Sequence, residues 1–66
     1  MTIADFNNLT ELEKVKLIID AKKISESEDD VATHQTFQIY DFLVDVSISV
    51  THRFRKIDKV YNLNAL

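Results

Sequence analysis

The sequence predicts an α+β fold, in which one N-terminal helix packs on an antiparallel meander of three or four strands. Three observations predict it. Apolar residues recur at every second position from residue 42 to residue 50, which is the pattern of a strand with one buried face. A capped amphipathic segment precedes this strand, and another strand-like segment follows it. The chain has 66 residues, so we expect one small domain over residues 1–66.

A helix is expected near the N-terminus, from about Thr10 to Lys22. Thr10 and Glu13 have the spacing of a capping box, in which each side chain accepts a hydrogen bond from the backbone N–H of the other residue. The apolar residues that follow recur every three or four positions and form one stripe: Leu12, Val15, Ile18 and Ile19. We expect this stripe to pack on the sheet, with Phe6 folding back onto the same apolar face.

The segment after the helix is rich in acidic residues. We expect a short edge strand at residues 24–26 and a solvated turn at residues 27–30. The acids of this segment are Glu26, Glu28, Asp29 and Asp30. They raise the alternative of a cation site, but the segment lacks the glycine and the regular ligand spacing of an EF-hand loop. The sequence therefore favours a polar turn, and we expect no metal.

The alternating strand is expected to pair with the segment that precedes it. If the chain reverses at residues 40 and 41, Phe37 lies opposite Val44, and the large apolar side chains of both strands share one face. Leu43 and Tyr40 are the two exceptions, and we expect them on the polar face. A slip of one residue would move Phe37 into water, so the apolar pattern specifies the register.

A last strand is expected at about residues 54–61. Its apolar residues fall on both faces of a regular strand, so alternation alone does not define its register. A bulge near Arg55 or Lys56 would bring Phe54 and Ile57 to the core together, and we expect a bulge at that place.

Two motifs of the chain resemble those of other proteins. They are Phe6–Thr10, followed by Glu13 and Lys14, and Tyr40–Val46. They resemble the opening helix and the central strand, Asp-Phe-Tyr-Val-Glu-Val, of a group of small bacterial proteins of about this length. The chain differs from that group in having no glycine in its turns and in having Leu43 where the group has an aromatic residue. The resemblance implies a helix followed by a meander; the group has no assigned activity, so it implies no functional residue.

The composition excludes several classes of site. Without cysteine, the chain has no thiol nucleophile, no zinc–thiolate site and no disulfide. Without glycine, it has no glycine-rich phosphate loop, dinucleotide-binding fingerprint or nucleophile elbow, so we expect no cofactor. The sequence has no apolar run of about 20 residues and no signal-peptide pattern. We therefore expect a soluble cytoplasmic protein that does not contact a membrane.

Three polar residues have the types found in a nucleophilic triad. In the expected register His34 lies opposite Ser47, and Asp45 is diagonal to His34 on the same face. Serine, histidine and aspartate also occur on the solvated face of strands, and a flat sheet offers no pocket that excludes water. The sequence favours this second interpretation, so we do not expect an enzyme.

Charge is distributed unevenly along the chain. Residues 1–50 carry four lysines against ten acids, a net charge of −6, whereas residues 51–66 carry four cations against one acid, a net charge of +3. Cations on a terminal strand indicate either protection against strand addition or contact with phosphates of a nucleic acid. The overall charge of −3 repels polyanions, so edge protection is favoured, and nucleic-acid binding through this basic strand is the alternative.

The function class that the sequence favours is a protein-interaction or regulatory module. Unpaired strand edges and a flat polar face with two exposed apolar side chains suit docking. The partner would be an unidentified protein or a second copy of the chain, as in a homodimer. The candidate interaction residues are Tyr40, Leu43, Arg53, Arg55, Lys56 and Lys59.

Overall fold

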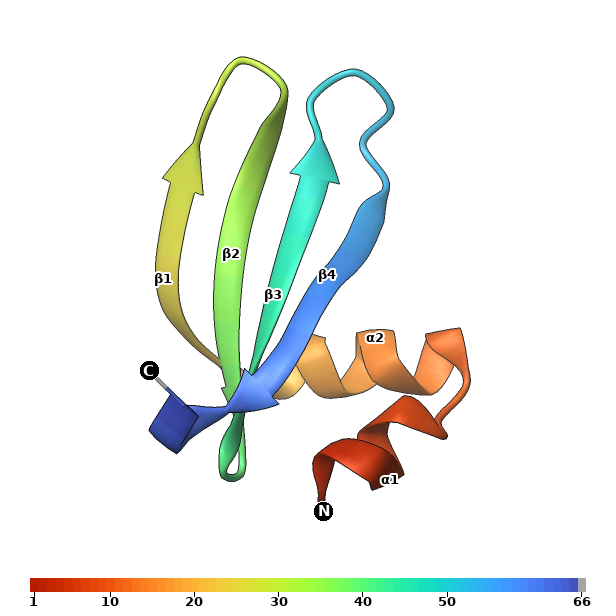
Figure 1. The fold of residues 1–66 in the computed structure, drawn as a ribbon. Coiled ribbons are helices and arrows are strands. Elements are labelled where there is room, and N and C mark those ends of the chain that lie inside the picture. Colours follow the sequence, from red (N-terminus) through yellow and green to blue (C-terminus); the bar gives the residue numbers. More distant parts are fainter. Residues whose placement is uncertain (66) are drawn as a thin grey trace.

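The computed structural model describes residues 1–65, which form two short helices followed by a four-stranded antiparallel sheet (Figure 1). The elements are α1 (Ile3–Asn7), α2 (Glu11–Asp20), β1 (Lys22–Glu28), β2 (Ala32–Ile39), β3 (Phe42–Ser49), β4 (Arg55–Asn62) and the 3-10 helix η1 (Leu63–Ala65). The strands lie in the order β1-β2-β3-β4, so consecutive strands are paired. The predicted α+β class and the helix-on-meander architecture are confirmed, with four strands in the sheet.

Both helices begin with a capping box. In α2 the Thr10 N–H donates to Glu13 Oε1 (3.0 Å), and the Glu13 N–H donates to the Thr10 hydroxyl (3.2 Å), as predicted. Thr2 and Asp5 make the same pair of bonds in α1, a helix that the sequence analysis does not predict. In each box the backbone N–H, and then the hydroxyl, lowers the pKa of the carboxyl group. α2 ends at Asp20, earlier than expected, because the next residue is already extended.

α2 turns only part of the expected face to the sheet. Ile18 is fully buried and Val15 is half-buried, as predicted, but Leu12 and Ile19 are 64% and 65% exposed. The face in contact with the sheet runs instead through Leu17, which packs against the core, and through the largely buried stem of Lys14. Apolar residues occur on both sides of Ile18 around the helix, so two overlapping stripes are available and the structure buries only one of them.

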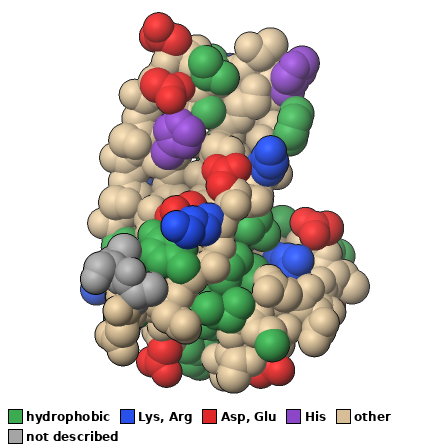
Figure 2. Space-filling view, in the orientation of Figure 1, with side chains coloured by type: hydrophobic (Ala, Val, Ile, Leu, Met, Phe, Trp, Pro, Cys, Tyr) green, Lys and Arg blue, Asp and Glu red, His purple; other side chains and the backbone are tan. Residues whose placement is uncertain are grey.

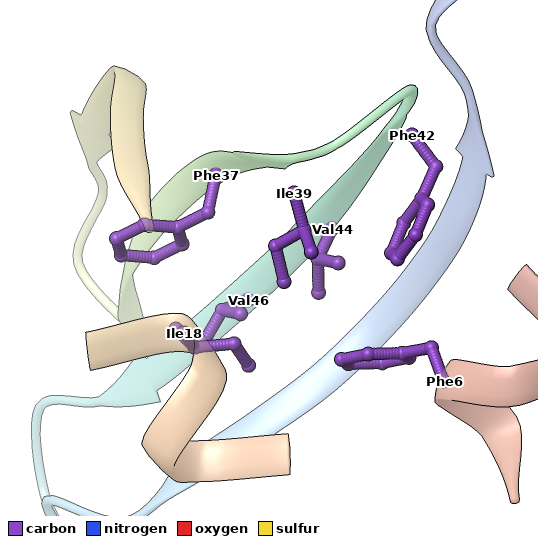
Figure 3. Packing of buried hydrophobic residues seen from close by; sticks show 7 residues of the cluster. All are labelled: Phe6, Ile18, Phe37, Ile39, Phe42, Val44 and Val46. Carbon is purple, nitrogen blue, oxygen red and sulfur yellow. The ribbon is translucent and has the colours of Figure 1, made fainter. Parts of the chain in front are cut away.

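Side chains from both helices and from β2 and β3 form the core. Its buried members are Phe6, Ile18, Phe37, Ile39, Phe42, Val44 and Val46. In Figure 3, Phe6 from α1 and Ile18 from α2 point toward the side chains of the sheet. The rings of Phe6 and Phe42 meet edge to face, with their centroids 5.6 Å apart. These contacts attach both helices to the same end of the sheet.

The β2–β3 hairpin has the predicted register. Phe37 lies opposite Val44, and the pairing continues in step from Ile39–Phe42 to the other end of the ladder. Tyr40 takes the positive φ (52°) that a tight turn requires, in a chain without glycine. The alternation of apolar residues was therefore sufficient to specify the pairing.

Leu43 is buried, which corrects the expectation that it is exposed on the polar face. It is only 1% exposed, although it lies on the side of the sheet opposite the helices. Its direct cross-strand neighbours are Gln38 and Tyr61, and their long side chains flank it on the sheet surface. The Tyr61 hydroxyl donates to Asp45 Oδ1 (3.1 Å). Desolvation and this bond raise the pKa of Tyr61. The face predicted to be flat and polar thus holds a small packed cluster.

β1 is longer than predicted and lies at an open edge of the sheet. It covers Lys22–Glu28, where a strand of only three residues was expected, and all seven of its residues are exposed. The register shifts between Lys23 and Ser25, so Ile24 is an extra residue opposite β2.

β4 contains the expected bulge, but at a different place. Asp45 lies opposite Lys59 and Val46 lies opposite Ile57, so Asp58 is the extra residue. The bulge lets Ile57 and Val60 both pack against the core. The predicted bulge near Arg55 or Lys56 is wrong, because Phe54 precedes the strand and stays 59% exposed. Ile57 and Val60, on either side of Asp58, pack against the core instead of Phe54.

The helices cover only one end of the sheet. In Figure 1 the β1–β2 and β3–β4 turns stand clear of α1 and α2, and we call this the open end of the sheet.

No helix within residues 1–65 has the length and apolar character needed to cross a membrane.

The contrast between the two isoleucines of α2 provides a test of its orientation. Ile18→Val should reduce the free energy of unfolding by about 1 kcal/mol, because it removes a buried methylene. Ile19→Val makes the same chemical change at an exposed position and should cost less than about 0.5 kcal/mol. Urea unfolding followed by circular dichroism measures both. Equal costs, or a larger cost at Ile19, would contradict this orientation.

Candidate functional site

A concave cleft lies between α2 and the beginning of β4. Its volume is about 340 Å³. The residues that line it are Glu11, Lys14, Val15, Ile18, Phe54, Arg55, Lys56 and Ile57. Apolar side chains from both elements are joined there by three cations and one acid, so the cleft combines an apolar surface with a positive rim.

The cleft exists because α2 reaches past the edge of the sheet. In Figure 1 the N-terminal half of α2 extends beyond β4, and Figure 2 shows the helical part of the molecule projecting on that side. We call this projecting part of α2 the ledge; Glu11, Lys14 and Val15 are its residues in the cleft. The side chain of Glu11 lies 3.5 Å from the Lys14 ammonium. β4 is the last strand of the sheet, so its outer backbone groups face the space above the ledge.

The β3–β4 turn holds Phe54 at the mouth of the cleft. Arg53 has a positive φ (57°), and its N–H donates to the Ser49 carbonyl (2.8 Å). The His52 N–H donates to the Ser49 hydroxyl (3.2 Å). The rings of His52 and Phe54 are stacked, with their centroids 5.8 Å apart. The exposed aromatic ring is thus supported by the turn instead of by the core.

The structure gathers three of the six predicted interaction residues near the cleft. Arg55 and Lys56 line it, and Arg53 lies in the adjoining turn. Lys59 is separate, because its ammonium lies over the Tyr61 ring at 4.9 Å on the face opposite the helices.

The other two predicted residues do not contribute to the cleft. Tyr40 is exposed, as expected, but it lies in the β2–β3 turn and does not line the cleft. Leu43 is buried. Sequence reasoning did not assign Lys14 to a site, and it predicted Val15 only as part of the stripe that packs on the sheet. Both residues reach the cleft because the helix projects beyond the strands. The only available signal was that the helix has more apolar positions than one stripe requires.

The acidic turn between β1 and β2 is held by one carboxylate. Asp29 Oδ1 accepts the N–H groups of Val31 and Ala32, each at 2.8 Å. Its other oxygen lies 2.9 Å from His34 Nε2. The Ala32 N–H, then His34 and the Val31 N–H lower the pKa of Asp29 to about 2. In Figure 2 acidic side chains gather at this end of the β1–β2 hairpin.

Two of the three residues with triad chemistry, His34 and Asp45, are bonded to other side chains. His34 does lie opposite Ser47, as the register predicts. Its ring, however, is bonded to Asp29, and Asp45 accepts hydrogen bonds from the hydroxyls of Thr36 (2.7 Å) and Tyr61 (3.1 Å). The Asp45 carboxylate and the His34 imidazole therefore bond to different partners and not to each other.

A comparison of the chain with family models, with curated proteins and with solved structures gives no match. The interpretation of the site therefore rests on its geometry.

The lowered pKa of Asp29 predicts a specific loss of stability in acid. A carboxyl group whose pKa is lower in the folded state stabilises the fold above its ordinary pKa of 3.8, and this contribution is lost as the pH falls through about 2. In Asp29→Asn the amide oxygen still accepts bonds but does not titrate. The variant should therefore lose less stability over this range than the natural chain, as measured by thermal unfolding. Identical pH dependence would contradict the assignment.

Proposed function

We propose that this chain is a non-enzymatic protein-binding module, which accepts an extended, acidic segment of a partner protein as an added strand along β4. The observation that carries this proposal is the ledge of α2 beyond an open edge strand. A fifth strand placed beside β4 would lie over the ledge and fill the cleft.

The backbone of β4 supplies the first part of the recognition. An edge strand presents N–H and C=O groups that have no partner within the sheet, and a bound strand satisfies them through main-chain hydrogen bonds. Such bonds provide affinity for extended segments of many sequences. Selectivity must then come from the side chains of the segment.

The side chains around the cleft favour acidic and apolar residues. Alternate residues of an added strand point to the same face, so every second side chain would point toward Val15 and Ile57. Arg55 and Lys56 on the strand, with Lys14 on the ledge, attract negative charge. The same cations repel the cationic β4 of another copy, so the edge protection expected from the sequence is compatible with this selectivity.

The bonding of His34 and Asp45 supports a non-enzymatic function. Each side chain is held by a structural partner, Asp29 in one case and Thr36 with Tyr61 in the other. These two residues therefore have structural roles in this fold.

The proposal predicts binding of an acidic β-forming peptide. A peptide of about eight alternating Glu and Val residues should shift NMR amide signals of residues 54–58 and 11–18, and a Lys-Val peptide of the same length should not. Arg55→Glu should weaken binding by about fivefold. Lys16→Glu, which reverses an exposed charge on α2 outside the cleft, is the matched control and should bind normally. Equal binding of both peptides, or shifts confined to another edge, would overturn the proposal.

Nucleic-acid binding is the second candidate, and one observation favours it. The exposed stack of His52 and Phe54 lies beside Arg53 and Arg55, which together offer a stacking surface and phosphate contacts. The net charge of −3 opposes it.

A single-stranded oligonucleotide separates the two candidates. We expect it to bind more weakly than the acidic peptide at the same ionic strength, as measured by fluorescence anisotropy. Tighter binding of the oligonucleotide, lost in Phe54→Ala and steeply reduced by salt, would move the assignment to nucleic acid.

A further inference from the structure

We infer that the chain forms a symmetric homodimer through its other open edge, in which β1 pairs antiparallel with β1 of a second copy. The proposal concerns β1 and is independent of docking at β4.

The first reason is the exposure of β1. All seven residues from Lys22 to Glu28 are exposed, and the strand terminates the sheet. It contains no proline, because the chain has none, so each of its residues keeps a backbone N–H donor. A long exposed edge strand is a template for a further strand, and natural proteins usually either block such an edge or use it.

The second reason is the order of charges along the strand. β1 begins with Lys22 and Lys23 and continues with Glu26 and Glu28. When two copies of such a strand run antiparallel, the cationic beginning of each one meets the acidic end of the other. The strand is therefore complementary to itself in the orientation that a two-fold axis produces.

The register follows from the bulge in β1. Lys23 and Glu26 both lie on the helix side of the sheet, because they pair with Phe37 and Gln35 of β2, and Ile24 is the extra residue between them. With a two-fold axis at Ser25, normal to the sheet, Ser25 lies opposite its own copy. Each Glu26 then lies opposite Lys23 of the other copy, with Ile24 again the extra residue.

The contacts within one chain already place these charges for the pairing. The Lys23 ammonium lies 3.1 Å from Glu26 Oε1, and the amide of Gln35 donates to the same oxygen (2.6 Å). Two such pairs brought together across the axis would place four charges at the corners of a square, with neighbouring corners of opposite sign. A carboxylate held by Gln35 loses little side-chain freedom when it gains a second lysine.

The two other edge pairings are less favourable, for different reasons. A β4–β4 pairing would join two strands that are each positively charged, because Arg55, Lys56 and Lys59 outnumber Asp58. A β1–β4 pairing is head to tail, which repeats without closing unless a ring forms. In the β1–β1 pairing the β1 edges of both copies are buried. Both β4 edges, with their clefts, remain accessible.

The absence of cysteine from the chain allows a direct test of the register. Ser25→Cys places two thiols at the axis, within the distance that antiparallel partners and a disulfide share. Under mild oxidation this variant should form covalent dimers several-fold faster than Ser27→Cys. In the latter, two thiols on the same strand face would lie about 13 Å apart across the axis. Equal rates for the two variants would overturn the proposal.

Charge reversal provides a second measurement that does not depend on oxidation. Lys23→Glu and Glu26→Lys should each weaken dimerisation by about tenfold, because two attractive pairs become repulsive, as measured by sedimentation at several concentrations. A mixture of the two variants should form heterodimers, since one edge is then acidic and the other basic. If the mixture remains monomeric while the natural chain associates, the proposed pairing is wrong.

One more variant separates this interface from the β4 site. Arg55→Glu should leave dimerisation unchanged even though it weakens binding of the acidic peptide at β4. Loss of association in Arg55→Glu would point to a β1–β4 contact and would overturn the symmetric pairing. A natural chain that stays monomeric at all accessible concentrations would also overturn it, without affecting the peptide test of the β4 site.

Discussion

The packing of Ile18 and Phe6 on β3 and its neighbours is the contact on which the rest of the structure depends. Ile18 is the only residue of α2 that is fully buried among the described residues, and Phe6 holds the shorter α1 against Phe42. Together they fix where the helices sit along the sheet. Because both anchors lie at one end, α2 crosses under β4 there and projects beyond it, which creates the cleft.

The hairpin at the centre of the fold was predictable because its apolar residues satisfy only one pairing. Phe37 and Val44 must lie on one side of the sheet, and a shift of one residue would place them on opposite sides, so tertiary packing and local pattern agree. The turn was predicted in spite of its chemistry, since Tyr40 must take a positive φ that glycine would adopt without cost. Hydrophobic burial therefore determines the register, and Tyr40 adopts the backbone conformation that this register requires.

The features that sequence reasoning placed wrongly are those for which two arrangements satisfy the same pattern. α2 has apolar residues around more than half of its circumference, so either Leu12 or Leu17 can accompany Ile18 to the core. The bulge in β4 can in principle occur at several positions, and Asp58 is the one that turns both Ile57 and Val60 inward. Leu43 is buried by its neighbour across the strands, which no pattern within one strand reveals. The cleft was not predictable for the same reason, because it is formed by the relative placement of α2 and β4.

The partial cover of the sheet also means that the fold is not held uniformly. At the covered end, strand hydrogen bonds lie against the core, so we expect exchange of their amide protons with solvent to require unfolding of the whole domain. At the open end they are backed mainly by turns such as the one that Asp29 organises, and local opening suffices. The first residues of β4, which line the cleft, belong to this less protected half. Occupation of the cleft would therefore slow amide exchange far beyond the bound strand. The exchange rates at the open end of the sheet would then show whether the cleft is occupied.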